Sequence, residues 1–244
     1  MASHAHATAE SRGYREPVTD LPLALVTGAS RGIGAAVAHV LEPSYRVLLG
    51  GRDADALRER ADELPGSEPW PVDLADAGAV REAAAHIDSL DVLVHSAGVA
   101  ELGTIAEADD AAWQANFEVN VLAMVRLTRL LLPALRAARG HVVVINSGAG
   151  LNARPGWGPY AASKFAAKAF ADALRAEEEG NGVRVTSIHP GRTDTEMQRG
   201  IVAGEGKEYD PSRFLRPDSV ATAVLTAVSA TPDAHLTDLV LRPS

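Results

Sequence analysis

The feature that most constrains the fold is a regular alternation of two kinds of segment, which begins at Leu23 and continues to Leu241. Short runs rich in leucine or β-branched residues alternate with alanine-rich stretches of helical spacing. Strands are expected over residues 23–27, 47–49, 71–72, 92–95, 141–146, 183–188 and 239–241. Helices are expected over residues 32–41, 54–64, 77–87, 111–138, 160–179 and 219–229, with a bend or a restart left open within the long stretch 111–138. Because mostly apolar strands must be covered on both faces, this order predicts an α/β fold, a single domain with a doubly wound parallel β-sheet and helices on both faces.

Two segments depart from this alternation. Residues 1–20 are polar and show no apolar periodicity, so they are expected to form a flexible N-terminal tail before a domain over residues 21–244. Residues 192–216 are rich in glycine and acidic residues and also lack periodicity. Because a loop of that length in a compact domain is usually functional or disordered, we expect a substrate-binding loop, whose glycines indicate a lid that orders on binding.

The bulk composition excludes several classes of protein and site. The 244 residues include no cysteine, which rules out disulfides, thiolate metal sites and cysteine nucleophiles, and we predict no metal site. The formal charge of −9 disfavours nucleic acid and anionic membranes as partners. No apolar run reaches the ~18–20 residues that a membrane span requires, and residues 1–20 lack the apolar middle of a signal peptide. We therefore expect a cytoplasmic protein.

A glycine-rich turn follows the first expected strand and opens the first expected helix. Residues 27–34 are Thr-Gly-Ala-Ser-Arg-Gly-Ile-Gly. Glycines let the backbone turn sharply and approach a pyrophosphate closely, while the helix N-terminus offers free N–H donors. The turn therefore indicates a dinucleotide site, with a glycine-rich turn that binds no ligand as the alternative.

This turn resembles that of the short-chain dehydrogenase/reductase superfamily, whose cofactor turn has the form Thr-Gly-x-x-x-Gly-x-Gly. The resemblance extends over residues 23–241, and later motifs follow in the order that the family shows. It implies a Rossmann-like fold and a nicotinamide cofactor. The implied contacts from the turn are Gly28, Ser30, Arg31, Gly32, Ile33 and Gly34.

Two arginines favour NADP(H) over NAD(H). An acidic residue after the second strand would bind the adenosine ribose, whereas arginine suits a 2′-phosphate. Here Gly51 and Arg52 follow that strand, and Arg31 lies within the glycine turn. The alternative is that both arginines are merely solvated. Asp73, with Leu74 beside it, resembles the adenine-contacting position of the family, although an aspartate there is often only a helix cap.

Tyr160 and Lys164 are the candidate acid/base pair. They are four residues apart in an expected helix, so their side chains share a face. A phenol of pKa ~10 is a poor base at neutral pH, and a nearby ammonium is expected to lower its pKa. Among the four tyrosines only Tyr160 has a lysine four residues later. A tyrosine and lysine at this spacing are nevertheless common on helix surfaces.

Two further positions acquire a catalytic role from the resemblance. Ser147 lies thirteen positions before Tyr160, which is the spacing of the serine in the family, where its hydroxyl would hold the substrate oxygen. Asn120 has Trp113 seven positions before it and Pro133 thirteen after it, as the family's catalytic asparagine does. The resemblance implies that Asn120 holds a water that relays protons between Lys164 and solvent.

The nicotinamide end of the cofactor is expected at two more segments. Pro190, Gly191, Thr193 and Thr195 resemble the family's Pro-Gly segment, and we expect His189 beside it to have a structural role. Residues 95–98 read His-Ser-Ala-Gly where the family has Asn-Asn-Ala-Gly. Ala97 and Gly98 still allow a close approach of the nicotinamide ribose, whereas the contacts of the first two positions are put in doubt.

The residues and the resemblance together imply an oxidoreductase that interconverts a ketone or aldehyde and an alcohol, on a small-molecule substrate. A catalytically idle NADP-sensing regulator and a non-redox isomerase or dehydratase on the same fold are the alternatives. The helices over residues 111–138 and 160–179 carry more apolar residues than one sheet face needs, so we expect a homodimer or homotetramer.

Overall fold

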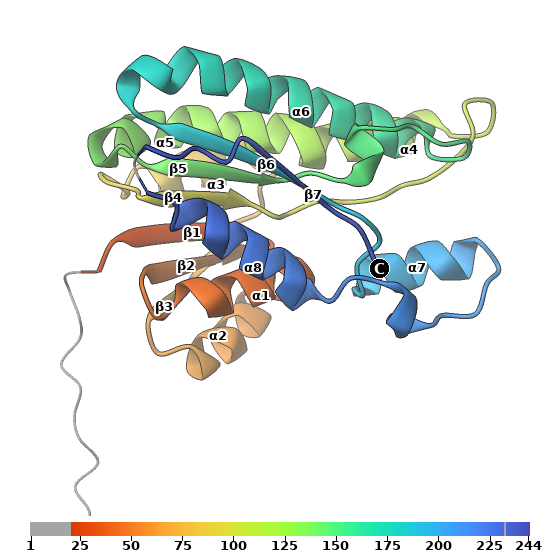
Figure 1. Cartoon of the computed structure of the whole chain (residues 1–244), viewed down its shortest axis with the longest axis horizontal. Coiled ribbons are helices and arrows are strands. Elements are labelled where there is room, and N and C mark those ends of the chain that lie inside the picture. The colour runs from red at the N-terminus through yellow and green to blue at the C-terminus, as the bar shows by residue number, and fades with distance from the viewer. Residues whose placement is uncertain (1–20, 232) are drawn as a thin grey trace, which may run out of the picture.

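The computed structural model describes residues 21–231 and 233–244, so the tail predicted over residues 1–20 lies outside the described part. Its centre is a seven-stranded sheet, in which every pair of neighbouring strands is parallel, with the order β3-β2-β1-β4-β5-β6-β7 (Figure 1). The strands are β1 (Leu23–Thr27), β2 (Arg46–Gly51), β3 (Ser67–Pro71), β4 (Val92–His95), β5 (His141–Ile145), β6 (Arg184–Pro190) and β7 (Asp238–Leu241). The predicted α/β fold is confirmed.

Helices cover both faces of this sheet (Figure 1). On one face lie α1 (Gly32–Leu41), α2 (Ala54–Glu63) and α8 (Pro217–Val228), whose apolar residues join one hydrophobic cluster with that side of the strands. On the other face lie α3 (Ala77–Ala84), α5 (Met124–Ala138) and α6 (Gly158–Glu178), which share a second cluster, and α4 (Asp110–Phe117) packs beside α6. The core is therefore divided in two by a sheet whose side chains point alternately to each cluster.

The order of the strands reverses direction between β1 and β4. From β1 the chain continues outward to β2 and β3, then returns to place β4 on the other side of β1. Ligands of open parallel sheets bind outside the carboxyl ends of the strands at such a switch point. The turn after β1 and the segment after β4 are therefore the first places to look for a ligand.

The structure differs from the sequence expectations in three elements. The helix expected over residues 111–138 is interrupted by a π-helical turn, η1 (Glu118–Ala123), between α4 and α5. The weak strand expected at residues 71–72 is β3, which begins at Ser67. The segment over residues 192–216 contains α7 (Glu196–Gly204) and a short 3-10 turn, η4 (Pro211–Arg213).

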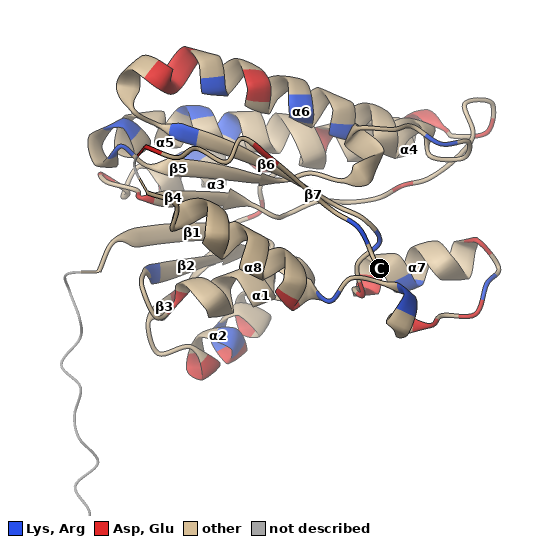
Figure 2. Ribbon diagram, viewed as in Figure 1, with Lys and Arg blue, Asp and Glu red and all other residues tan. Residues whose placement is uncertain are grey.

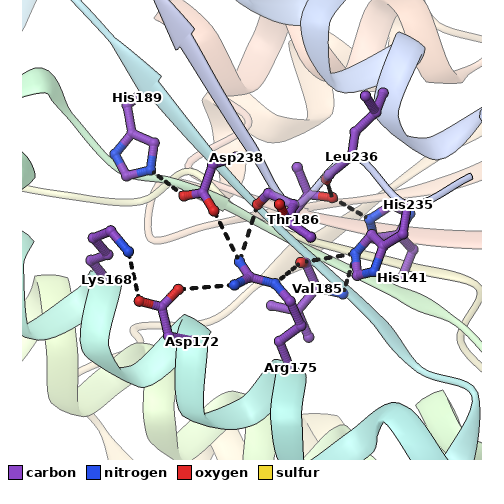
Figure 3. Close-up of polar contacts among 11 residues, drawn as sticks. His141, Lys168, Asp172, Arg175, Val185, Thr186, His189, His235, Leu236 and Asp238 are labelled. Atoms are coloured by element: carbon purple, nitrogen blue, oxygen red, sulfur yellow. Dashed lines mark hydrogen bonds and ion pairs between the residues drawn. The ribbon is translucent and has the colours of Figure 1, made fainter.

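A network of polar side chains joins β7 to β6 and α6 (Figure 3). Asp238 on β7 lies 2.9 Å from Nε2 of His189 on β6, and 3.7 Å from the guanidinium of Arg175 on α6. Arg175 in turn pairs with Asp172, which also accepts a hydrogen bond from Lys168. His189 is fully buried, and it faces Asp238 just before the segment Pro190-Gly191. This placement supports the structural role expected for it.

The polar surface carries charges of both signs. Figure 2 shows basic and acidic residues interleaved along α6 and around the segment that contains α7. Within residues 21–231 and 233–244, no helix combines the length and the apolar character needed to cross a membrane.

Candidate active site

The glycine turn after β1 forms a narrow cradle that side chains would fill. Gly28 and Gly32 have φ of 69° and 57°, a region that L-residues other than glycine rarely adopt. A Cβ on Gly34 would lie 2.2 Å from the carbonyl oxygen of Gly28, and a Cβ on Gly28 would lie 2.9 Å from the Ala97 nitrogen. No side chain caps the N-terminus of α1, so its first N–H groups remain available to an anion. The turn therefore fits the pyrophosphate of a dinucleotide.

A cavity of about 1880 Å³ extends from this turn along the carboxyl ends of the strands. Its lining includes most of the predicted cofactor residues: Gly28, Ser30, Arg31, Gly32, Ile33, Gly34, Arg52, Asp73, Leu74, Ala97, Gly98 and Thr195. Pro190, Gly191 and Thr193 line a second cavity instead, described below. The structure therefore brings the predicted cofactor residues to one edge of the sheet, although they come from five separate segments of the chain.

The two arginines predicted to recognise a 2′-phosphate are in different situations. Arg31 forms an ion pair with Glu196 at 2.5 Å, and both side chains are mostly exposed. Arg52 is exposed, and within the described ranges it forms no ion pair. Asp73 lines the cavity and accepts a hydrogen bond from the Ala75 nitrogen at 3.0 Å, a local turn contact; the cap of α3 is Asp76, so the alternative of a helix cap at Asp73 is wrong.

The side chains of His95, which ends β4, and of Ser96, which follows it, have different surroundings. His95 is buried and points toward α5, with Nε2 2.8 Å from Oγ1 of Thr128, and burial lowers its pKa to about 3. Ser96 lines both cavities. The nitrogens of Ser96 and Ala97 donate to Oγ1 of Thr27 at 3.0 and 3.1 Å. Thr27 thus fixes this segment, a role that its place in the glycine motif alone did not indicate.

Ser147 and Tyr160 lie at the bottom of a second cavity of about 360 Å³. Ser147 ends the segment after β5 and accepts a hydrogen bond from the Ala149 nitrogen at 3.1 Å, which caps the short 3-10 turn η2 (Gly148–Gly150). Tyr160 lies in the first turn of α6 and is only 7% exposed. Burial raises the pKa of Tyr160, and a hydrogen bond with Ser147 opposes that shift more weakly.

Lys164 lies one helical turn after Tyr160, as the spacing predicted. Its Nζ donates to the carbonyl oxygen of Ile145 at 3.2 Å and lies 5.8 Å from the centre of the Tyr160 ring. Burial lowers the pKa of Lys164 to about 8. The sequence argument expected the ammonium of Lys164 to lower the pKa of Tyr160. This expectation is wrong, because the pKa is raised by the cost of burying a phenolate, which outweighs the opposing influence of Ser147.

Asn120 lies in the π-helical turn η1, and its side chain holds two elements together. Oδ1 accepts from the Val99 nitrogen at 2.9 Å, while Nδ2 donates to the Val99 oxygen and to Oγ of Ser163, both at 3.0 Å. A Cβ on Gly98 would lie 3.1 Å from Oδ1 of Asn120 and 3.8 Å from Nζ of Lys164. Asn120 and Lys164 therefore face each other across Gly98, and the water relay between them stays a prediction.

The second cavity unites the candidate catalytic residues with the expected nicotinamide segment. Its lining includes Ser147, Tyr160 and Lys164 together with Pro190, Gly191, Thr193 and Thr195. Ile33, Ser96 and Gly98 line both cavities, so the two adjoin. A long cavity at the glycine turn thus opens beside a smaller one that holds a buried phenol, a hydroxyl and an ammonium.

Residues 22–206 match the family model described as short chain dehydrogenase. The chain belongs to the short-chain dehydrogenase family. This short-chain dehydrogenase is 34% identical over 237 residues to the uncharacterized short-chain type dehydrogenase/reductase y4eK of Sinorhizobium fredii, covering 93% of this chain and 94% of that protein. It is 35% identical to the glycine betaine reductase ATRR of Emericella nidulans over 91% of this chain, but spans only 18% of that much longer protein.

A solved structure agrees with the family over nearly the whole chain. An alcohol dehydrogenase from the archaeon Thermococcus sibiricus, complexed with 5-hydroxy-NADP, matches this short-chain dehydrogenase with a TM-score of 0.83 and 29% identity. The match covers 92% of this chain and 97% of that one. The Rossmann-like arrangement implied by the sequence resemblance is thereby confirmed.

Proposed function

We propose that this short-chain dehydrogenase is an NADP(H)-dependent oxidoreductase that interconverts a ketone or aldehyde and an alcohol, with Tyr160 as the acid/base. The observation that carries the proposal is the meeting of Ser147, Tyr160 and Lys164 in one cavity that adjoins the cavity of the glycine turn. The cofactor bound by the Thermococcus sibiricus relative supports NADP(H), as do Arg31 and Arg52 in the lining.

The residues present fit such a cofactor along its whole length. The N-terminus of α1 and the glycine turn would hold the pyrophosphate, and Arg52 with Arg31 would hold the 2′-phosphate. Gly98, Gly191 and Thr195 would surround the nicotinamide end, where both cavities meet. Bound NADPH supplies the hydride for the carbonyl carbon.

The side chains of the small cavity would manage the carbonyl oxygen and its proton. Ser147 and Tyr160 line the same cavity, with Ser147 near enough to oppose the rise in the pKa of Tyr160, and the two hydroxyls would hold that oxygen together, so that negative charge developing on it is stabilised. Because burial raises the pKa of Tyr160, the phenol is protonated at neutral pH and ready to act as the acid. Lys164 adds a positive charge next to the phenol as its proton leaves. In the oxidation of an alcohol the same phenol acts as the base.

The variant Tyr160→Phe tests this proposal. The rate of NADPH oxidation is measured from the fall in absorbance at 340 nm with a panel of ketones and aldehydes. We expect this rate to fall by about 10³-fold or more in the variant, since a general acid typically contributes 10²–10⁴-fold. The Kd for NADPH, measured by fluorescence titration, should stay within a few-fold. Tyr45→Phe, at a tyrosine outside both cavities, is the matched control and should keep full activity.

Three outcomes separate the proposal from its alternatives. A Tyr160→Phe enzyme that retains most of its activity would show that another group moves the proton. Tight NADPH binding without any oxidation across the panel would favour a regulator that only binds the cofactor. Conversion of a substrate without net change in NADPH would favour an isomerase or dehydratase.

A further inference from the structure

The charges that line the small catalytic cavity have the opposite sign to the protein as a whole. The chain carries a formal charge of −9. Among the described residues, the charged side chains of this cavity are all basic: Arg154, Lys164, Arg192, Arg213 and Arg242. No described aspartate or glutamate lines it. The adjoining cofactor cavity, by contrast, has both acidic and basic residues in its wall.

The arginines come from four different segments that the fold brings together. Arg154 lies in the loop between η2 and α6, and Arg192 follows β6. Arg213 ends the 3-10 turn η4 beyond α7, and Arg242 follows β7 at the end of the chain. These positions follow no local sequence pattern, so only the fold shows that the four arginines line one cavity.

Three of the four arginines form no ion pair with a carboxylate in the described part of the chain, although the positive charge of Arg213 acts on the nearby Asp210. Arg192 donates two hydrogen bonds to Glu205, which also pairs with Lys207, and lies over the ring of Trp157, 5.7 Å from its centre, so Arg192 is already engaged within the protein. Arg154, Arg213 and Arg242 form no ion pair within residues 21–231 and 233–244. The cavity therefore holds an excess of positive charge over and above that of Lys164.

Arg242 places one of these positive charges next to the segment that carries Ser147. Its Nη1 lies 2.7 Å from the point where a Cβ on Gly148 would be, and Gly148 directly follows Ser147. None of the three unpaired arginines lines the cofactor cavity, so the phosphates of a dinucleotide at the glycine turn would not meet them. The positive charge of these three arginines is therefore available to an anionic group of the substrate in the small cavity.

We propose that the substrate is a small carbonyl compound that carries an anionic group, a carboxylate or a phosphate ester, held by Arg154, Arg213 and Arg242. The planar guanidinium fork suits both groups, which it can bind through paired hydrogen bonds. A cavity of about 360 Å³, part of which the nicotinamide would occupy, limits the substrate to a small molecule. In the reaction the carbonyl carbon accepts a hydride from NADPH and its oxygen accepts the Tyr160 proton, giving the alcohol and NADP⁺, while the anionic group makes and breaks no covalent bond. This inference rests on the proposed function.

Matched pairs of substrates test it with the full chain and NADPH. Short oxo acids of three to six carbons, such as 4-oxopentanoate, are compared with their methyl esters, and dihydroxyacetone phosphate is compared with dihydroxyacetone. We expect the anionic member to be preferred at least tenfold in kcat/KM, and the arm with the larger preference identifies carboxylate or phosphate. Raising the salt concentration should reduce the preference, since salt screens the attraction.

Variants at the arginines assign the preference to them. Arg213→Gln and Arg242→Gln should each reduce the ratio of kcat/KM between anion and neutral partner about tenfold, mostly through KM. Arg213→Lys, which keeps the charge but loses the fork, should restore part of that ratio. Arg81→Gln, an exposed position on α3 outside both cavities, removes the same charge and should leave the ratio unchanged.

Binding provides a readout that does not depend on turnover. Calorimetric titration of the enzyme saturated with NADP⁺ should give a Kd for 4-oxopentanoate or dihydroxyacetone phosphate that weakens in Arg213→Gln and not in Arg81→Gln. Equal kcat/KM for the neutral and anionic members of each pair would overturn the proposal of an anionic substrate and leave the proposed function intact. The absence of NADPH oxidation with every compound of the panel would overturn the proposed function itself.

Discussion

Arg31 and Arg52 both line the cavity at the glycine turn, but of the two only Arg31 forms an ion pair in the described part of the chain, with Glu196. We therefore expect Arg52 to carry more of the preference for NADPH. The preference should be at least tenfold in kcat/KM, or about 1.4 kcal/mol, as charge-assisted phosphate contacts supply. Arg52→Ala should erode it mainly by raising the KM for NADPH, with little effect on NADH.

The control for this prediction is Arg58→Ala, an exposed arginine of α2 that pairs with Asp55 and does not line the cavity. Steady-state kinetics with both cofactors provide the measurement. Equal use of NADPH and NADH by the unmodified enzyme would contradict the assignment of either arginine to the 2′-phosphate.

At the same scale, the sequence predicted residues whose roles follow from fixed spacing along the chain. Tyr160 and Lys164 share a helix face, and Ser147 lies thirteen positions before Tyr160. The hydrogen bonds of Thr27 and the convergence of Arg213 and Arg242 could not be predicted, because each joins segments that only the folded sheet brings together. The direction of the pKa shift of Tyr160 depends on burial, which spacing does not report.

Among the elements, the contact between β4 and α5 should make the stability of the fold depend on pH. His95 of β4 is buried against Thr128 of α5, and its pKa in the folded chain is about 3. Below pH 6.5 the unfolded chain binds a proton at this histidine that the folded chain does not. The contribution of His95 to the free energy of unfolding is therefore fully present above pH 6.5 and is lost progressively as the pH falls toward 3. Between pH 8 and pH 5 this loss amounts to about 2 kcal/mol.

Urea unfolding of His95→Asn at pH 8 and pH 5 measures this contribution. The variant should be less stable than the unmodified protein at pH 8, since it loses the contact with Thr128, yet should lose about 2 kcal/mol less on acidification. His86→Asn, at an exposed position, is the matched control. An unchanged difference between the two pH values in His95→Asn would mean that His95 is protonated in the folded protein.

The elements that the sequence missed have local physical causes. Asn116 and Asn120 lie in the long helical stretch expected over residues 111–138, and the π-helical turn there places Asn120 against Val99 and Ser163. The low helix propensity of asparagine is consistent with an irregular turn at this place, but it does not by itself indicate a π-helical one. The helix α7 went unrecognised because Gly200 and Gly204, both poor helix formers, hide its pattern, although Thr195 caps it by accepting a hydrogen bond from the Gln198 nitrogen.

For the whole molecule we expect a homodimer through α5 and α6, on a smaller surface than the sequence suggested. Much of the apolar surface expected to be free is used within the protomer, where Leu127, Leu131 and Leu174 are buried. Leu122 and Phe165 remain 49% and 43% exposed. Exposed alanines, Ala169 and Ala173, follow Phe165 at four-residue intervals along α6 and would let a second helix approach closely.

Light scattering at micromolar concentration should therefore give twice or four times the mass of 25.5 kDa. Phe165→Glu should halve that mass, giving a monomer from a dimer or a dimer from a tetramer, because a charge in an apolar interface is costly to bury. Ile105→Glu, at another exposed apolar residue, is the control and should leave the assembly intact. A monomer mass for the unmodified protein would exclude the paired-helix interface.

The position of the arginines also bears on how readily the protein could change its specificity during evolution. Arg154, Arg213 and Arg242 stand on connecting segments or at the end of a strand, and none belongs to the two hydrophobic clusters that hold the sheet and its helices together. Substitutions at such surface positions usually alter stability by less than about 0.5 kcal/mol. A descendant could therefore exchange these charges one by one, and take up neutral or cationic compounds, while the scaffold and the acid/base pair stayed as they are.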